Sequence, residues 1–153
     1  MNFSALSNIA EKLIAAGQRR VGIMEARARE LLDHVNIPSF RMHEAPAHFS
    51  GGMQQRVQIA KALSNNPPIL LLDEVSTGLD VSVQAKVLDL IKQIQRELGI
   101  SLLLVSHDLG VIRMLADRSI VMLNGLIVEE GLTDQILEDP QHQYTQELVH
   151  SLL

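Results

Sequence analysis

A short apolar run that ends in two acids constrains the fold of this 153-residue chain more than any other feature. Ile69–Leu72 is followed directly by Asp73 and Glu74. An apolar run of this length without polar alternation is typical of a strand buried on both faces of a parallel sheet. A second such run, Ser101–Val105, follows a long helical pattern, and the order strand, helix, strand favours parallel pairing. The sequence therefore predicts an α/β fold from residue 67 onward.

Capping residues mark two helices in this part of the chain. Asp80 is a favourable N-cap for a long helix, and Gly99 is a favourable residue just beyond its end. Asp108 is placed to cap a shorter helix directly after the second strand. The long helix has apolar residues at the helical period, and we expect its inner face to consist of Val87, Leu90, Ile91, Ile94 and Leu98.

The last part of the chain carries a hairpin signal. Asn124 and Gly125 tolerate positive φ and stand between two apolar segments, Ser119–Leu123 and Leu126–Glu130. They predict an antiparallel hairpin. Two short closing helices are predicted at Thr133–Glu138 and Tyr144–Leu153.

Residues 1–66 have a different, all-helical character. Asn8 and Glu11 form a capping box for a first helix, a second helix is expected over Ile23–Val35, and Ser50 can open a third. The Asn-Asn-Pro-Pro sequence of residues 65–68 ends the third helix. We therefore expect a helical domain at residues 1–66 and an α/β domain at residues 67–153.

Composition and charge exclude several classes of function. The net charge is −5, which argues against a broad basic face, so no nucleic-acid partner is expected. The chain has no Cys, which excludes disulfides and thiolate metal sites. Its apolar runs are far too short to cross a bilayer, and its N-terminal stretch does not resemble a secretory signal. A cytoplasmic location is expected.

Ser50, Gly51 and Gly52 form a candidate anion site. Two glycines behind a capping serine leave the first backbone N–H groups of a helix unshielded, and these donors at the positive helix end suit a phosphate. An ordinary serine N-cap after a loop would give the same residues. Taken alone, the segment favours that simpler interpretation.

Asp73 and Glu74 form a candidate catalytic pair at the end of the first strand. Open α/β sheets bind ligands at the carboxyl ends of their strands. Asp73 could hold a magnesium ion through water, and Glu74 could polarise a water for attack on a phosphoryl group. Acids are also common where any strand meets solvent, so the pair alone is a weak signal.

Asp80 and His107 complete the candidate set. Ser76–Asp80 is a turn that leads into a helix cap, and His107 lies just past the second strand. A neutral imidazole there could donate to a terminal phosphate, although a lone histidine is more often structural. Each of these segments has a simple structural explanation when it is considered alone. Together they favour a nucleotide site, because their order along the chain would bring all of them to one phosphate chain.

The order of these motifs resembles that of the ATP-binding cassette (ABC) family. Phe49–Arg56, which reads FSGGMQQR, is similar to the ABC signature motif, usually LSGGQ followed by Gln-Arg. Ile69–Glu74 resembles the Walker B strand with its catalytic glutamate, Thr77–Asp80 the D-loop, and His107 the switch histidine. The resemblance covers essentially the whole chain. It implies a P-loop NTPase fold truncated at the N-terminus, with an α-helical subdomain followed by the C-terminal half of a RecA-like core.

The resemblance also implies partners and ligands. Family members form a head-to-tail dimer with a second ABC ATPase subunit and hold two ATP molecules between the subunits. The signature residues contact the ATP that the other subunit holds, and here they are Ser50, Gly51, Gly52 and Gln54.

Other residues serve the subunit's own site in the family. By this resemblance Glu74 and His107 are catalytic, Asp73 holds Mg²⁺ through water, and Asp80 belongs to the D-loop. ATP binding closes the family dimer, and hydrolysis opens it.

Within the family, the chain most resembles ATP-binding subunits of phosphonate carbon–phosphorus lyase systems. FSGGMQQR, LDVSVQA at residues 79–85 and GLTDQILEDPQHQYT at residues 131–145 carry this resemblance. It implies a role in phosphonate metabolism. The implied partners are the lyase core complex or membrane permease subunits, with a place at the inner face of the cell membrane. Oligopeptide and dipeptide importer ATPases share much of the pattern and are the alternative.

Three residues depart from the family pattern. Met53 replaces the fifth signature residue, usually Gln, and Gln143 replaces a Pro in the tail. Val75 stands where the family usually has Pro after the catalytic glutamate. Losing that Pro frees φ, so we expect a looser loop with no catalytic group removed.

The largest departure is a missing motif. A phosphate-binding loop reads GxxxxGK followed by Ser or Thr, and these 153 residues contain none. We therefore expect the chain alone neither to bind ATP tightly nor to hydrolyse it. We also expect one edge of the strand Ser101–Val105 to be unpaired, with apolar faces to match.

Three hypotheses remain for the function of the chain. It is part of an ATPase subunit, a non-enzymatic docking module that offers its signature in trans, or a gene remnant that begins at an internal Met1.

Overall fold

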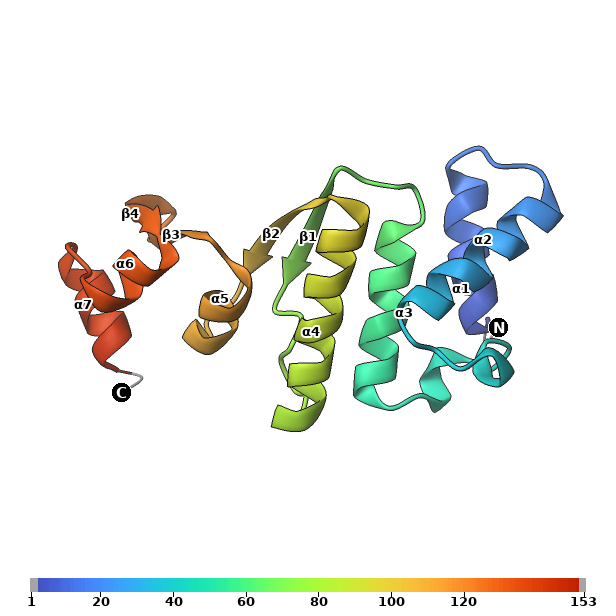
Figure 1. The fold of residues 1–153 in the computed structure, drawn as a ribbon, viewed down its shortest axis with the longest axis horizontal. Coiled ribbons are helices and arrows are strands. Elements are labelled where there is room, and N and C mark those ends of the chain that lie inside the picture. Colours follow the sequence, from blue (N-terminus) through green and yellow to red (C-terminus); the bar gives the residue numbers. More distant parts are fainter. Residues whose placement is uncertain (1–2, 152–153) are drawn as a thin grey trace. The chain divides into compact units, whose positions relative to one another are not determined.

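The computed structural model describes residues 3–151 and has a mixed α/β structure (Figure 1), which confirms the predicted fold class. The helices are α1 (Ala5–Ala15), α2 (Val21–His34), α3 (Gly51–Leu63), α4 (Val81–Leu98), α5 (Leu109–Leu115), α6 (Thr133–Glu138) and α7 (Gln143–His150). The strands are β1 (Ile69–Asp73), β2 (Ser101–Val105), β3 (Arg118–Leu123) and β4 (Leu126–Leu132). Two short 3-10 helices, η1 (Ser39–Arg41) and η2 (Pro46–His48), lie between α2 and α3.

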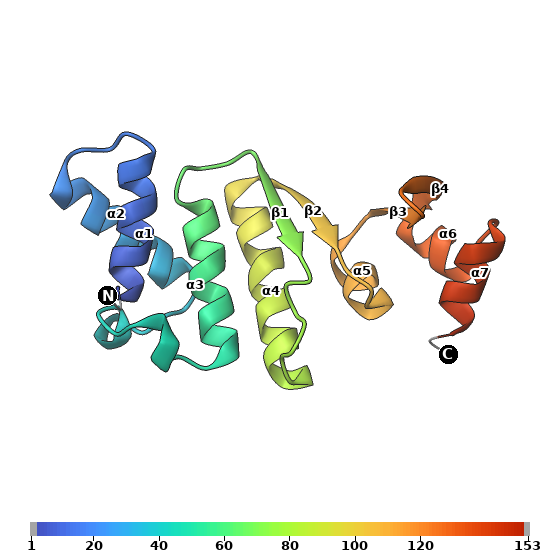
Figure 2. The ribbon, with the colours of Figure 1, turned by 180° about the vertical axis from the view of Figure 1, so that it is seen from behind.

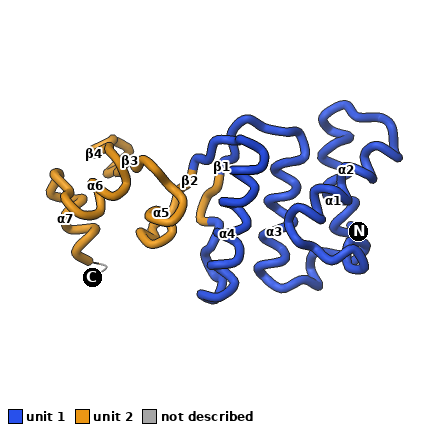
Figure 3. Tube along the Cα trace, viewed as in Figure 1, with its two compact units in different colours: residues 1–71, 75–103 blue, residues 72–74, 104–153 orange. Residues whose placement is uncertain are grey.

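The chain divides into two compact units (Figure 3). The first unit consists of residues 1–71 and 75–103, and the second consists of residues 72–74 and 104–153. The second unit thus includes the last two residues of β1, Leu72 and Asp73, and the residue that follows the strand, Glu74. The domain boundary predicted after residue 66 concerns the subdomains of a family and stays a prediction.

The first helix begins earlier than the sequence pattern predicted. Ser4 is its N-cap, and the Ser4 hydroxyl accepts a hydrogen bond from the Ser7 backbone N–H at 3.1 Å. Asn8 lies inside the helix and donates its side-chain amide to the Ser4 carbonyl at 3.0 Å. The predicted capping box of Asn8 and Glu11 is therefore wrong. Ser4 already satisfies donors of the first turn one turn upstream, as N-cap residues do.

Three helices form the core of the first unit. The helices α1, α2 and α3 contact one another, and α3 also contacts α4 (Figures 1 and 2). Because the chain has no Trp and few aromatics, aliphatic side chains and Met fill this core. Its largest fully buried members are Ile9, Leu31, Leu32, Ile37, Met42 and Leu63.

The long helix α4 begins and ends as the sequence predicted. Asp80 is its N-cap and accepts from the Val83 backbone N–H at 3.0 Å, and Gly99 follows its end with φ of 62°. Four of the five predicted inner residues are buried, and Leu88 is buried as well. Leu98 is 43% exposed, because it is the last helical residue and extends past the packed face.

The strands β1 and β2 pair side by side in a parallel sheet (Figures 1 and 2). In the first unit the Ser101 N–H donates to the Pro68 carbonyl at 3.0 Å, and Ile69, Leu71 and Leu103 are exposed on one face of the strands. The prediction of strands buried on both faces is therefore wrong for this structure. Among the described residues this sheet contains only β1 and β2, and Leu103 and Val105 of β2 are exposed. The unpaired edge of β2 stays a prediction.

The second unit contains the predicted hairpin. The strands β3 and β4 pair antiparallel, and Asn124 and Gly125 connect them with φ of 52° and 79°. The Ser119 and Thr133 hydroxyls lie 2.8 Å apart and join β3 to the start of α6. Residues 152–153 of the predicted last helix lie outside the described residues. No helix in residues 3–151 is both long enough and apolar enough to cross a membrane.

Candidate functional site

Two predicted catalytic side chains meet where β1 and β2 end in the second unit. His107 Nδ1 lies 2.8 Å from Glu74 Oε1, which is a hydrogen bond in which the ring N–H donates to the carboxylate. Both side chains reach solvent, with 77% of the His107 side chain and 38% of the Glu74 side chain exposed. A ligand could therefore approach the pair without any rearrangement of the core.

The backbone at Glu74 has an unusual conformation. Its φ is 50°, in the left-handed region that residues other than glycine seldom occupy. The Glu74 N–H donates to the Val105 carbonyl at 2.9 Å, so the parallel pairing holds this conformation in place. Such strain is maintained when the surrounding structure fixes it, and it clusters at functional sites.

The hydrogen bond also shifts the pKa of the histidine. The Glu74 carboxylate raises the pKa of His107, first by accepting its hydrogen bond and then by its negative charge, and the nearby Asp108 charge raises it further. Asp108 itself caps α5 by accepting from the Gly110 and Val111 N–H groups. The pair is therefore a carboxylate that favours the protonated form of the imidazole directly beside it.

Asp73 supplies one further carboxylate at this strand end. It is the last residue of β1 and is exposed. The part of the chain that the structure describes holds no group of three or more His, Cys, Asp or Glu that could bind a metal ion. One carboxylate fits a magnesium ion that takes its other ligands from phosphates and water.

The predicted anion site lies at the start of α3 in the first unit. Gly51 is the first helical residue and Ser50 is the N-cap residue, but the Ser50 side chain makes no capping hydrogen bond. Ser50 and Gly51 are exposed, whereas Gln54 Nε2 donates to the Phe49 carbonyl at 3.1 Å. We call residues 50–52 the Ser50–Gly52 turn. Its uncommitted hydroxyl and first helical N–H groups are suitable donors for an anion.

Gly52 has a packing role that the sequence did not reveal. It is buried, and a Cβ built on it would overlap Val83 Cγ1 of α4. A Cβ on Gly51 would instead lie 3.2 Å from Leu79 Cδ2. The starts of α3 and α4 therefore touch, which brings the Ser50–Gly52 turn close to the Asp80 cap.

Replacing Gly52 with Ala is expected to destabilise the chain. Overpacking against a stiff β-branched side chain costs about 1–3 kcal/mol, which equals or exceeds the roughly 1 kcal/mol that Ala usually gains over Gly in a helix. Thermal or urea unfolding of the 153-residue chain measures the effect. Gly51→Ala is the matched control and should change stability little, because Leu79 Cδ2 is the end of a flexible side chain.

A second substitution tests the cause of that loss. Val83→Ala removes the methyl group that the new Cβ would overlap, so the double variant Gly52→Ala, Val83→Ala should recover most of the stability. Equal destabilisation with and without Val83 would contradict the packing explanation.

The structure brings the predicted site residues together in two groups. Asp73, Glu74 and His107 lie in the second unit, and the Ser50–Gly52 turn, Gln54 and Asp80 lie in the first. Asp80 caps α4 and also accepts from the Ser82 hydroxyl at 2.8 Å. These contacts lower the pKa of Asp80, the Ser82 hydrogen bond first and the Val83 N–H second. The hydrogen bond that Asp80 accepts from the Val83 N–H confirms its predicted role as the cap of α4.

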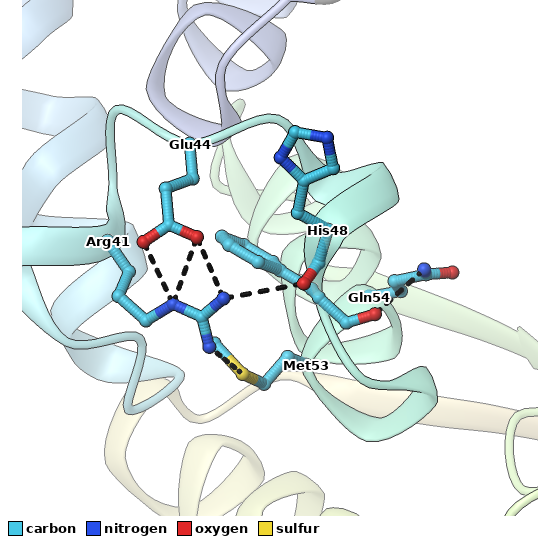
Figure 4. A network of polar contacts seen from close by, with 6 residues as sticks. Arg41, Glu44, His48, Met53 and Gln54 are labelled. Carbon is cyan, nitrogen blue, oxygen red and sulfur yellow. Dashed lines mark hydrogen bonds and ion pairs between the residues drawn. The ribbon is translucent and has the colours of Figure 1, made fainter.

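Sequence reasoning missed the residues that surround the Ser50–Gly52 turn. Arg41 and Glu44 form an ion pair at 2.7 Å just upstream, and the Arg41 side chain reaches Met53 just downstream (Figure 4). The only signal in the sequence was the spacing of opposite charges three residues apart, which is common on protein surfaces.

Comparison with protein families and curated proteins gives concordant matches. A family model described as ABC transporter matches residues 2–77. The chain is 51% identical over 150 residues to the putative phosphonates utilization ATP-binding protein PhnK of Escherichia coli (strain K12), covering 98% of this chain and 60% of that protein. It is 48% identical over 126 residues to the oligopeptide transport ATP-binding protein OppF of Lactococcus lactis subsp. lactis (strain IL1403), covering 82% of this chain and 40% of that protein.

A solved structure has a similar fold. It is the dimeric, post-hydrolysis ATP-binding cassette MJ0796 bound to ADP and Pi, with a TM-score of 0.72 and 34% sequence identity. The match covers 86% of this chain and 57% of that chain. The 153 residues thus span less than two thirds of the length of each of these relatives.

Proposed function

The chain belongs to the ABC transporter ATP-binding family, and from this premise we propose that it forms part of an ATPase subunit of a phosphonate uptake or carbon–phosphorus lyase system. In this proposal the Ser50–Gly52 turn and Gln54 contact ATP held by a second ATPase subunit in a head-to-tail dimer. The observation that carries it is the exposed Ser50 hydroxyl, which makes no capping bond at the start of α3. A helix start with such donors suits a phosphate.

The second unit would supply the hydrolytic groups. Glu74 would orient and polarise the attacking water, and His107 would donate to the terminal phosphate. Asp73 would hold Mg²⁺ through water, and that ion supplies positive charge at the phosphates when bound. The Glu74 backbone, which its hydrogen bond to Val105 fixes, supports this assignment because it aims the carboxylate at His107.

The 153 residues need a phosphate-binding loop from elsewhere. No GxxxxGK segment followed by Ser or Thr occurs in them, so we propose that they neither bind ATP tightly nor hydrolyse it by themselves. We place the protein in the cytoplasm, at the inner face of the cell membrane, and give it the lyase core or permease subunits as partners. These assignments rest on family resemblance.

The phosphonate system is preferred to an oligopeptide or dipeptide importer. The similarity to the E. coli phosphonate protein extends over 98% of this chain, whereas that to the oligopeptide protein extends over 82%. Genes for lyase components beside this gene would support the choice, and genes for peptide permeases would reverse it.

A complementation experiment tests the proposed function. The partner is the E. coli phosphonate protein with the residue that matches Ser50 changed to Arg, so that a functional turn must come from the added chain. We expect the 153-residue chain to restore ATP hydrolysis in a saturable manner, because it offers an intact Ser50–Gly52 turn in trans. Binding to the partner without restored hydrolysis would contradict the in-trans role of the Ser50–Gly52 turn, and neither binding nor hydrolysis would favour the gene remnant.

A further inference from the structure

Arg41 contacts the segments on both sides of the Ser50–Gly52 turn (Figure 4). On the upstream side, its guanidinium donates to the His48 carbonyl at 3.4 Å, and its Cζ lies 4.9 Å from the centre of the Phe49 ring. On the downstream side, Nη1 donates to Met53 Sδ at 3.3 Å. One side chain therefore ties together the residues that enter the turn and the residue that leaves it.

Glu44 fixes the guanidinium in this position. Arg41 Nε lies 3.0 Å and 3.1 Å from the two Glu44 carboxylate oxygens, and Nη2 lies 2.7 Å from Oε2. The hydrogen bonds, more than the charges alone, raise the pKa of Arg41 and lower the pKa of Glu44. A planar fork of this kind is specific to Arg, since Lys offers a point charge on a flexible stem.

The contacts leave Arg41 a poor candidate for direct ATP binding. Its Nε, Nη1 and Nη2 atoms all donate to groups of the chain itself. Phe49, which the guanidinium covers, is only 6% exposed and anchors the entry to the turn in the core. The network therefore orders backbone next to a binding site without presenting a ligand of its own.

We propose that Arg41 is a positioning residue, which holds the Ser50–Gly52 turn in the geometry that receives a phosphate of ATP bound to a second subunit. This proposal rests on the proposed function. An ordered site loses less conformational entropy when it binds, and an error of 1 Å in position can cost about 100-fold in rate. Met53, which departs from the usual signature Gln, provides the downstream attachment through its sulfur atom.

The complementation assay separates positioning from simple stabilisation. With Arg41→Ala we expect the ATPase rate at saturating chain to fall roughly 10- to 100-fold. The KM for ATP should change little, because the partner's own loop holds the nucleotide. A purely structural role would instead raise the concentration of chain needed for saturation and leave the saturated rate unchanged, and that result would overturn the proposal.

Two further variants sharpen the test. Arg41→Lys keeps the charge but loses the planar fork of hydrogen-bond donors. Its ATPase rate at saturating chain should therefore be almost as low as that of Arg41→Ala. Arg29→Ala is the matched control, because Arg29 forms a comparable 2.9 Å ion pair with Glu25 on α2. Full rescue by Lys, or an equal loss in the Arg29 variant, would count against positioning.

A measurement without ATP keeps the proposal testable if the wild-type chain restores no hydrolysis, a result that would refute the proposed function. NMR amide signals of Gly51 and Gly52 should shift or broaden in Arg41→Ala and stay unchanged in Arg29→Ala. Unchanged glycine signals in folded Arg41→Ala would overturn the positioning role, whatever the outcome of the ATPase assay.

Discussion

Glu74→Gln is expected to abolish ATP turnover in a completed subunit and to leave ATP binding and dimer closure intact. The completed subunit joins the portion of the E. coli phosphonate protein that this chain does not match to residues 1–153. Glutamine has nearly the size of glutamate but cannot accept a proton from water. Loss of a general base typically costs 10²- to 10⁴-fold in rate, so we expect a decrease of at least about 100-fold.

Phosphate release and ATP-dependent dimerisation measure the two halves of this prediction. Glu97→Gln is a suitable control, because Glu97 is an exposed carboxylate on α4 that only accepts from the Gln93 side chain at 2.8 Å. It should hydrolyse ATP at the rate of the unchanged subunit. Normal turnover in Glu74→Gln would contradict the catalytic role of Glu74, and loss of ATP binding would indicate a structural role.

The same substitution has a second result that requires no nucleotide. Glu74 raises the pKa of His107, so Glu74→Gln should bring this pKa back towards its ordinary value, which an NMR titration of the histidine rings measures. The stability of the folded chain therefore depends on pH. A raised pKa in the folded state contributes stability below the ordinary histidine pKa, and this contribution is lost as the pH rises through the raised pKa. Because both side chains reach solvent, we expect a small, salt-sensitive effect.

Local signals in the sequence predicted the elements of the fold well. The Asp80 and Asp108 caps, the Gly99 terminator and the hairpin at Asn124–Gly125 all occur as expected. Each depends on residues close in sequence, whose backbone preferences act within one turn. The pairing of Glu74 with His107 was the exception, because it joins residues 33 positions apart. It could be anticipated because parallel strands place their carboxyl ends at the same edge.

Contacts between distant residues account for what the sequence could not predict. Gly52 reads as an exposed helix start, but its neighbour is Val83 on another helix. Arg41 and Glu44 read as surface charges, and only the chain path brings Met53 to the same guanidinium. The apolar residues of β1 indicate two buried faces, but how many faces are covered depends on what else packs against the sheet.

Ser50→Arg is expected to remove the ability of the 153-residue chain to restore hydrolysis in the complementation assay. The larger side chain would fill the exposed start of α3 and replace the hydroxyl, so the turn could not close on a phosphate held by the partner. The variant should fold normally, because Ser50 is exposed and makes no capping bond. The rate should fall to the value measured without added chain, with circular dichroism confirming the helices.

Ser151→Arg provides the control for that loss. It adds the same charge and volume at the exposed C-terminal end of α7, outside the unit that carries the turn. This variant should restore hydrolysis as well as the unchanged chain does. If Ser50→Arg also restored hydrolysis, the start of α3 could not be the surface that meets ATP. The uncapped hydroxyl would then be an incidental feature of a loop-to-helix junction, and the positive helix end would need no anion to explain it.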